Sequence, residues 1–145
     1  MAVDGIASSA RPGGQVFGRI DASTDLLDRL PHYDFVVIAT PLTEATRHLF
    51  GAEAFKAMRP SARLINIGRG PIVDTDALVA ALRAGQIAGA GLDVFETEPL
   101  PEDHPLWDLP GVVISAHMSG DLVGWREALM RQFADNFHRW RQGQP

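Results

Sequence analysis

The sequence predicts an α/β protein with a doubly wound parallel sheet that has helices on both faces. Short runs rich in Val and Ile alternate along the chain with segments that carry helix signals, as in strand–helix–strand units. These runs are continuously apolar, which is typical of parallel strands buried on both faces. Helical crossovers between such strands keep them parallel.

Four apolar runs are the predicted strands of this sheet, and a fifth, weaker run lies near the start. The clearest is FVVIA at residues 35–39. The others are ARLINIG at residues 62–68, GAGLDVF at 89–95 and GVVIS at 111–115, with the weaker AVDGIAS at 2–8. Their lengths and β-branched content favour strands over helices.

Two short helices are predicted in the first half of the chain. Leu26, Leu27 and Leu30 form one short apolar face. Residues 52–58 form a second helix, which Pro60 ends because proline lacks an amide donor and clashes with the preceding turn.

Two further helices have clearer signals. In residues 73–86, Asp74 can cap the amino end and Gly85 can close the carboxyl end. A long amphipathic helix is predicted from about residue 122 to residue 141, because its large apolar residues recur every three or four positions. These residues are Trp125, Leu129, Phe133, Phe137 and Trp140. We interpret the stripe as core or interface.

Composition excludes several classes of function. The 145 residues are 46% hydrophobic and 21% charged, as in one ordinary globular domain. A net charge of −5 argues against a nucleic-acid partner, which requires a surplus of Lys and Arg. No apolar run reaches the roughly 18–20 residues of a membrane span, and the start lacks a secretory signal pattern. We therefore expect a cytoplasmic protein. The absence of cysteine excludes zinc–thiolate sites, and we assign no metal site.

Polar residues with catalytic potential follow the predicted strands. Ligands of open parallel sheets bind outside the carboxyl ends of the strands, so these residues gather at one rim. They are Thr40 and Pro41 after the first strand, Arg69 after the second, Asp93 and Glu98 at and after the end of the third, and His117 after the fourth. Glu98 lies in a loop, residues 96–110, that contains four prolines, and long loops of this kind are more often functional than not.

This set suits the chemistry of a 2-oxo acid. Arg69 offers a bidentate fork for a carboxylate. His117 can donate or accept a proton near neutral pH, and Glu98 can orient the imidazole and stabilise its protonated form. Because no side chain supplies a hydride, reduction of the carbonyl requires a cofactor.

Each residue also has a purely structural interpretation. Arg69, between two glycines, can cap a turn, and His117 can be a hydrogen-bonded histidine at the rim. Glu98 can be a solvated loop charge, and Asp93 can be the cap of a following turn. We assign no function to the other histidines, which are His32, His48, His104 and His138.

Three long motifs run through most of the chain. They are FVVIATPLTEATRHLFGAEAFKAMRP, LINIGRGPIVDTDALVAALRAGQIAGAGLDVFETEPLP and HPLWDLPGVVISAHMSG. In order and spacing they resemble the D-isomer-specific 2-hydroxyacid dehydrogenases, which include glyoxylate/hydroxypyruvate reductases. The resemblance extends from about residue 34 to the C-terminal helix, and it implies a partial Rossmann-like fold that binds NAD or NADP.

The resemblance also implies roles for individual residues. Arg69 would bind the substrate carboxylate and carbonyl and lie near the cofactor. His117 would be the acid/base, also next to the cofactor, with Glu98 as its carboxylate partner. The remaining cofactor contacts would be Asp93 near the nicotinamide ring, Thr40 and Pro41 on the adenosine side, the backbone of Ile67 and Gly68 at the nicotinamide ribose, and Gly120 at the carboxamide.

The sequence departs from the family pattern at its start. The G-x-G-x-x-G loop that holds the pyrophosphate is absent, and Gly13-Gly14 does not replace it. We therefore expect residues 1–120 to form a dinucleotide-binding domain without its first βα unit. Residues 121–145 would form the helix that in this family returns towards the substrate domain. Arg11 would suit a 2′-phosphate and favours NADP, although it can equally be a solvated loop residue.

The leading hypothesis is an NAD(P)-dependent oxidoreductase that reduces a small 2-oxo acid such as glyoxylate or hydroxypyruvate. The alternative is a non-catalytic or degenerate nucleotide-binding module from a truncated dehydrogenase gene. The sheet edge left by the missing strand predicts self-association, with a homodimer as the simplest form.

Overall fold

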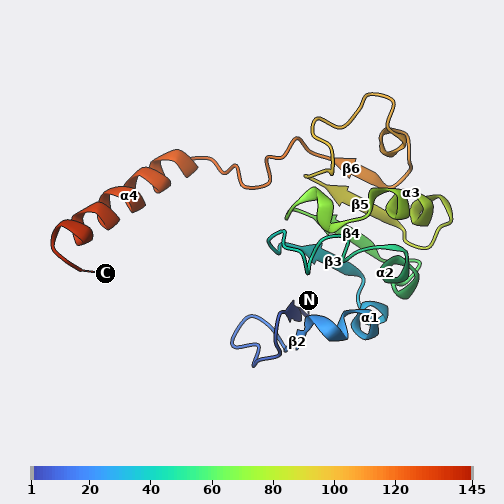
Figure 1. The fold of residues 1–145 in the computed structure, drawn as a ribbon, viewed down its shortest axis with the longest axis horizontal. Coiled ribbons are helices and arrows are strands. Elements are labelled where there is room, and N and C mark those ends of the chain that lie inside the picture. Colours follow the sequence, from blue (N-terminus) through green and yellow to red (C-terminus); the bar gives the residue numbers. More distant parts are fainter. Residues whose placement is uncertain (1, 145) are drawn as a thin grey trace.

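The computed structural model describes residues 2–144 and shows two parallel sheets (Figure 1). The strands are β1 (Gly5–Ala7), β2 (Ile20–Ala22), β3 (Phe35–Ile38), β4 (Arg63–Asn66), β5 (Gly89–Leu92) and β6 (Val112–Ile114). The pair β1–β2 forms one sheet, and the other has the order β3-β4-β5-β6. Every pairing is parallel, which confirms the predicted class of sheet.

The strands are shorter than the apolar runs that predicted them, and β2 was not predicted. The weak run at residues 2–8 does form β1. Ile20–Ala22 carries only three residues of strand, with an acid at its centre, and it is ordered by pairing with β1. A pattern of apolar residues cannot identify a strand this short.

Among residues 2–144, helices α1 (Leu26–Arg29), α2 (Ala52–Ala57) and α3 (Thr75–Arg83) and several short 3₁₀ turns lie between the strands, and a fourth helix, α4 (Trp125–Arg141), follows the last strand. The predicted caps of α3 are confirmed. The Asp74 carboxylate accepts the amide of Ala77 at 3.0 Å, and Gly85 has a φ of +65°, the left-handed conformation that favours glycine after a helix.

A single apolar core lies between the four-stranded sheet and helices α1 to α3. The largest fully buried apolar side chains in it are Phe55, Leu30, Leu64, Ile72, Leu78 and Leu106. Leu26 and Leu30 are buried as predicted, but Leu27 is half exposed, so the predicted three-leucine face is wrong at that position. A helix of four residues presents only one narrow face to the core, and Leu27 lies outside it.

The opposite face of this sheet is uncovered, so the prediction of strands buried on both faces is wrong. Phe35 and Val37 on β3 are 54% and 55% exposed, and Val113 on β6 is 70% exposed. Helices α1 to α3 lie on the other side of the sheet (Figure 1). An apolar run shows which faces a strand can bury, but the covering element must come from elsewhere in the fold, and residues 2–144 place none there.

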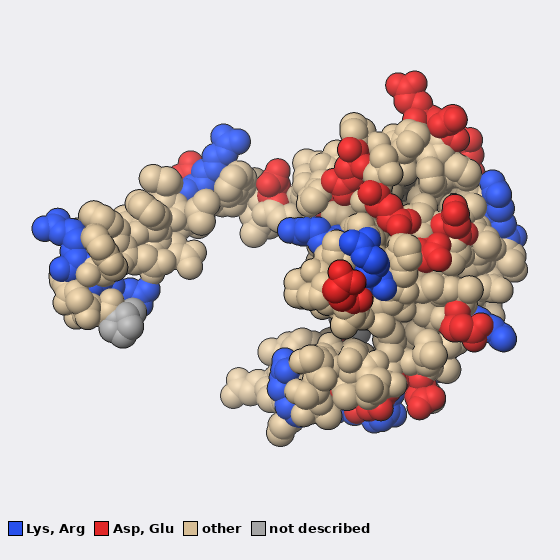
Figure 2. Space-filling model, in the orientation of Figure 1, with Lys and Arg blue, Asp and Glu red and all other residues tan. Residues whose placement is uncertain are grey.

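Helix α4 extends away from the sheets as an isolated rod (Figure 1). It begins three residues later than predicted, and none of its residues is buried. Its apolar stripe is therefore exposed along its whole length. Figure 2 shows mostly basic charges on α4 and many acidic ones on the body of the molecule. Among residues 2–144, no helix has the length and apolar content that a membrane crossing requires.

Candidate functional site

His117 and Glu98 form a hydrogen-bonded pair beyond the carboxyl ends of β5 and β6. The His117 Nδ1 and Glu98 Oε2 atoms are 2.8 Å apart. The other carboxylate oxygen of Glu98 accepts the amide of Phe95 at 2.9 Å. The bond with His117, together with this amide, lowers the pKa of Glu98. The carboxylate is thus held in its charged form and fixes one nitrogen of the imidazole.

The buried carboxylate of Asp93 shapes the turn that carries His117. Asp93 is only 3% exposed. It accepts the Ser115 hydroxyl and the backbone amides of Met118 and Ser119, at 2.8 and 2.9 Å for the two amides. These bonds enclose His117, whose φ of +53° is unusual for a residue other than glycine.

The same bonds control the charge of Asp93. Burial by itself raises the pKa of this carboxyl, but the hydrogen bonds from Ser115, Ser119 and Met118 outweigh burial and bring the pKa well below its ordinary value. Asp93 is therefore a buried anion that acts through the His117 turn.

Arg69 lies in a second loop at the same rim, directly after β4. The side chain of Asn66, at the end of β4, accepts the amide of Gly68 at 3.0 Å and donates to the carbonyl of Arg69 at 3.1 Å. The Arg69 guanidinium itself is exposed and donates through Nη1 to the Gly68 carbonyl at 2.7 Å. The backbone of this loop is thus fixed, while the guanidinium faces solvent.

Gly70 brings the Arg69 loop into contact with the loop of Glu98. A Cβ atom on Gly70 would lie 1.8 Å from the carbonyl oxygen of Phe95, so only glycine fits. The amide of Phe95 is also the one that binds Glu98. The arginine and the histidine–glutamate pair are thus carried by two loops in direct contact.

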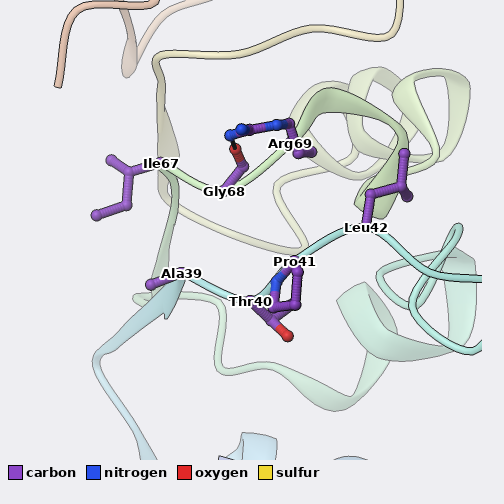
Figure 3. A pocket seen from close by; sticks show the side chains of 7 residues that line it. All are labelled: Ala39, Thr40, Pro41, Leu42, Ile67, Gly68 and Arg69. Atoms are coloured by element: carbon purple, nitrogen blue, oxygen red, sulfur yellow. Dashed lines mark hydrogen bonds between the residues drawn. The ribbon is translucent and has the colours of Figure 1, made fainter. Parts of the chain in front are cut away.

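A cavity of about 500 Å³ adjoins Arg69 (Figure 3). It is lined by the loops after β3 and β4, namely Ala39, Thr40, Pro41, Leu42, Ile67, Gly68 and Arg69. Gly68 is needed here as well, because a Cβ atom would lie 2.9 Å from the carbonyl oxygen of Thr40. The close approach of these two loops leaves a shallow, open hollow with backbone on both sides.

The structure brings most of the predicted site residues together in two groups. One contains Asp93, Glu98 and His117, and the other contains Thr40, Pro41, Ile67, Gly68 and Arg69. Among the described residues, no hydrogen bond or ion pair joins the two groups side chain to side chain. Gly120 follows the His117 turn and has open space around it. Arg11 lies apart, in an antiparallel bridge with Ile20 beside β2.

Sequence reasoning missed a second histidine–carboxylate pair beside the site. The Nε2 atom of His48 lies 2.7 Å from Oε1 of Glu96, whose other oxygen accepts the amide of Thr75 at the start of α3. Glu96 is two residues from Glu98, so this pair anchors the loop of Glu98. His48 and Glu96 are 48 positions apart in two loops, and no local pattern could have paired them. The sequence could have identified Asn66, because it is a polar residue inside the apolar run at residues 62–68.

A parallel α/β sheet with its polar residues at the carboxyl rim and a glycine-lined hollow between two loops defines a Rossmann-like nucleotide-binding domain. Comparison with known proteins specifies the family. Residues 5–119 match the family model described as "D-isomer specific 2-hydroxyacid dehydrogenase, NAD binding domain". The chain belongs to this family.

Individual relatives and solved structures lead to the same family. Glyoxylate/hydroxypyruvate reductase B of Escherichia fergusonii is 56% identical over 119 residues, which is 82% of this chain and 37% of the relative. A D-isomer specific 2-hydroxyacid dehydrogenase family protein of Aeromonas salmonicida has a TM-score of 0.89 at 37% identity, covering 100% of this chain and 46% of that one. An NADPH-dependent glyoxylate/hydroxypyruvate reductase of Sinorhizobium meliloti, solved with NADP and sulfate, has a TM-score of 0.84 at 30% identity, with coverage of 100% and 46%. The chain thus spans less than half the length of these three proteins.

Proposed function

We propose that this chain provides the cofactor side and the acid–base residues of an NAD(P)-dependent 2-hydroxyacid dehydrogenase. The substrate class is a small 2-oxo acid such as glyoxylate or hydroxypyruvate, which the reductases similar to this chain are named for. The observation that carries the proposal is the His117–Glu98 bond of 2.8 Å, held in place by the buried Asp93. An ordinary surface histidine does not require a buried anion to shape its turn.

The cavity beside Arg69 supports a nucleotide as the cofactor. Its two walls approach so closely that Gly68 cannot carry a side chain, which leaves backbone groups for contact with ribose and base. When bound, a nicotinamide cofactor supplies or accepts the hydride. Thr40, Pro41 and Ile67 would line its path, and Gly120 would lie at its carboxamide. Arg11 favours NADP, as its charge suits a 2′-phosphate.

The chain's own residues supply the proton and the substrate clamp. Glu98 holds Nδ1 of His117, so that Nε2 is the nitrogen that donates a proton to the carbonyl oxygen during reduction and accepts it during oxidation. Arg69 uses one guanidinium nitrogen for its own loop, and its other N–H groups bind the substrate carboxylate. Asp93 keeps the turn of His117 in position.

A chimera tests this function directly. Residues 5–119 of this chain replace the matching segment of the full-length E. fergusonii relative, and glyoxylate-dependent oxidation of NADPH is followed by absorbance. We expect the chimera to be active. His117→Gln in the chimera should lower kcat at least about 100-fold, since a positioned acid/base contributes roughly 10²–10⁴. The matched control is His104→Gln, because the His104 imidazole lies outside the proposed set and accepts the amide of Leu106 at 3.2 Å.

A folded, nucleotide-binding chimera without turnover would show that these residues do not support hydride transfer. The isolated chain is the second arm of the experiment. Because it lacks a G-x-G-x-x-G loop, we expect weak NADPH binding and little turnover. Rapid, His117-dependent oxidation of NADPH by the isolated chain would contradict that expectation.

We also propose a division of the chain into two parts with different roles. Residues 1–120 act as the dinucleotide-binding domain, and α4 within residues 121–145 packs with its apolar stripe on a substrate-binding half. The strand edges that have no partner among residues 2–144 support association with a second copy of the chain, as a homodimer.

A further inference from the structure

The proposed reaction requires a fixed spacing between Arg69 and His117. The carboxylate and the carbonyl of a 2-oxo acid are directly bonded, so the groups that bind them must stay within about 0.5 Å of their positions. Among residues 2–144, no side-chain hydrogen bond joins Arg69 to the Glu98–His117 pair. The contact of Gly70 with Phe95 stops the two loops from approaching further, but it does not hold them together. Holding them together requires an attractive contact.

The Glu96 carboxylate makes two bonds that reach the Arg69 side of the site. Glu96 lies two positions before Glu98 in the same loop. Its Oε1 atom is 2.7 Å from Nε2 of His48, and its Oε2 atom accepts the amide of Thr75 at 2.9 Å. Burial raises the pKa of this carboxyl, but the bonds from Thr75 and His48 outweigh burial and lower it. Glu96 is therefore an anion, and its place at the amino end of α3 favours that charge.

The segment that contains His48 is bonded to the segment that follows the Arg69 loop. His48 donates its backbone amide to the carbonyl of Pro71 at 2.8 Å, and two further backbone bonds join Phe50 to residues 71–74. The φ of His48 is +50°, so these bonds hold its backbone in a conformation that is unusual for a residue other than glycine. The second partner of Glu96 comes directly after residues 71–74. Both partners are thus fixed to the loop of Arg69.

The bond between Glu96 and His48 has a defined direction. An ionised carboxylate only accepts hydrogen bonds, so Nε2 of His48 carries the proton in this pair. That nitrogen can carry a proton in the neutral imidazole as well as in the protonated one. The link therefore persists whether His48 is neutral or charged.

We propose that Glu96 and His48 are positioning residues for the 2-oxo acid substrate. Their bond sets the spacing between the loop that carries Arg69 and the loop that carries Glu98. Neither residue contacts the substrate, and both act through the residues whose loops they join. The inference rests on the proposed function for the identity of the substrate, whereas the link between the loops can be measured without catalysis.

The first test measures which nitrogen of His117 carries the proton in the full chain. The ionised Glu98 carboxylate accepts from Nδ1 of His117, so the neutral imidazole is the Nδ1–H form. Nitrogen-15 NMR at about pH 8, where an ordinary histidine is neutral, distinguishes this form from the Nε2–H form. In Glu96→Ala the loop of Glu98 is released, so we expect at least about half of His117 to adopt the Nε2–H form. The His117→Gln variant identifies the signals of His117.

The second test measures substrate use in the chimera described above. Glu96→Ala should lower kcat/KM for glyoxylate at least about tenfold, since misplacement by about 1 Å costs up to about 10²-fold. KM for NADPH should change by less than about twofold, because the cavity after β3 and β4 is not lined by Glu96. Glu102→Ala is the matched control and should leave both constants unchanged, because Glu102 is an exposed carboxylate in the same loop.

Two further variants separate the bonds of Glu96 from its charge. Glu96→Gln keeps an oxygen for the Thr75 amide and gains an NH₂ group that can donate to neutral His48. At the same pH it should therefore keep kcat/KM within about threefold of the wild type. His48→Ala removes one of the two bonds. Added to Glu96→Ala, it should change kcat/KM by less than about twofold, because the bond is already lost.

A folded Glu96→Ala chain in which His117 keeps the Nδ1–H form would overturn the proposal, as would an unchanged kcat/KM in an active chimera. Equal damage from Glu96→Gln and Glu96→Ala would also overturn it, since the charge and not the bonds would then matter. Circular dichroism checks folding, and His48→Ala takes the place of Glu96→Ala in both tests if the latter does not fold. A chimera that binds NADPH without turnover contradicts the proposed function instead, and the NMR measurement still decides the positioning role.

Discussion

At the scale of single residues, the site depends on a buried anion that makes no hydrogen bond to Glu98 or Arg69. Asp93 binds the Ser115 hydroxyl and the amides of Met118 and Ser119, and these bonds enclose His117. A neutral side chain at this position could accept fewer of the three donors. Asp93 is therefore a positioning residue for the proposed acid/base.

Asp93→Asn tests how much the charge of Asp93 contributes to stability, because asparagine has nearly the same shape without the charge. Asp93→Asn leaves buried donors unsatisfied, so we expect the free energy of unfolding at pH 7 to fall by about 2 kcal/mol. Urea denaturation followed by circular dichroism measures this change. Ser115→Ala, which removes one of the three donors and leaves the carboxylate, is the matched control and should cost less.

The free energy of unfolding that Asp93→Asn loses should depend on pH in a direction that follows from the pKa of Asp93. The pKa of Asp93 lies below its ordinary value of 3.8 in the folded state. A carboxyl of this kind contributes stability above that ordinary pKa, and the contribution is lost as pH falls through the folded pKa. The difference in stability between the wild type and Asp93→Asn should therefore narrow on acidification below about pH 4. A difference that stays constant down to about pH 2 would show that the charge is not involved.

At the scale of elements, the site is made by loops that contact each other through glycine. Gly70 places the Arg69 loop against Phe95, and the His48–Glu96 pair ties the same region to the start of α3. The strands fix where each loop begins. These contacts then fix how close Arg69 comes to the loop of Glu98.

Gly70→Ala tests this contact. The new Cβ atom would lie 1.8 Å from the Phe95 carbonyl oxygen, so the two loops must separate. We expect a loss of about 3 kcal/mol in the free energy of unfolding, and in the chimera a larger rise in KM for glyoxylate than fall in kcat. Gly120→Ala is the control for stability alone, because a Cβ there meets nothing within 4 Å. Equal stability of the two variants would contradict the close approach.

At the scale of the whole molecule, two apolar surfaces are exposed. One is the open sheet face with Phe35, Val37 and Val113, and the other is the stripe on α4. Soluble monomers rarely expose apolar patches of this kind, which usually mark interfaces. The mostly basic α4 and the acidic body also carry opposite charges (Figure 2). These two surfaces support the proposed packing of α4 on a substrate-binding half and the proposed association of two copies.

We therefore expect the isolated chain to self-associate as its concentration rises. Sedimentation velocity over a wide concentration range should show an increasing weight-average mass. Val37→Lys places a charge on the open face and at the free edge, and it should weaken association. Arg63→Lys, on the same face, keeps the charge and serves as the control. A monomer at every concentration would rule out the homodimer.

Much of the fold could be predicted because its signals are local. The caps of α3 depend on residues within one helical turn, and the apolar runs of β3 to β6 are contiguous. Burial on both faces could not be predicted in the same way. The apolar run at residues 35–39 shows that both faces of the strand can be buried, but it does not show which element of the fold would cover each face. The three-residue strand β2 depends on its pairing with β1, and short-range patterns do not contain that information.

The same distinction between local signals and long-range contacts applies to the candidate site. The order of strands and the rule that ligands bind at their carboxyl ends placed Arg69, Glu98 and His117 at one rim from the sequence alone. The pairing of Glu98 with His117 was also expected from the sequence, and the structure shows the two side chains 2.8 Å apart. Only the tertiary structure gave Asp93 its place under the turn and paired His48 with Glu96. The sequence determines residue types, helix caps and strand propensity, because these act over a few positions. Side-chain partners and open sheet edges depend on the paths of loops and on strand neighbours far apart in the chain.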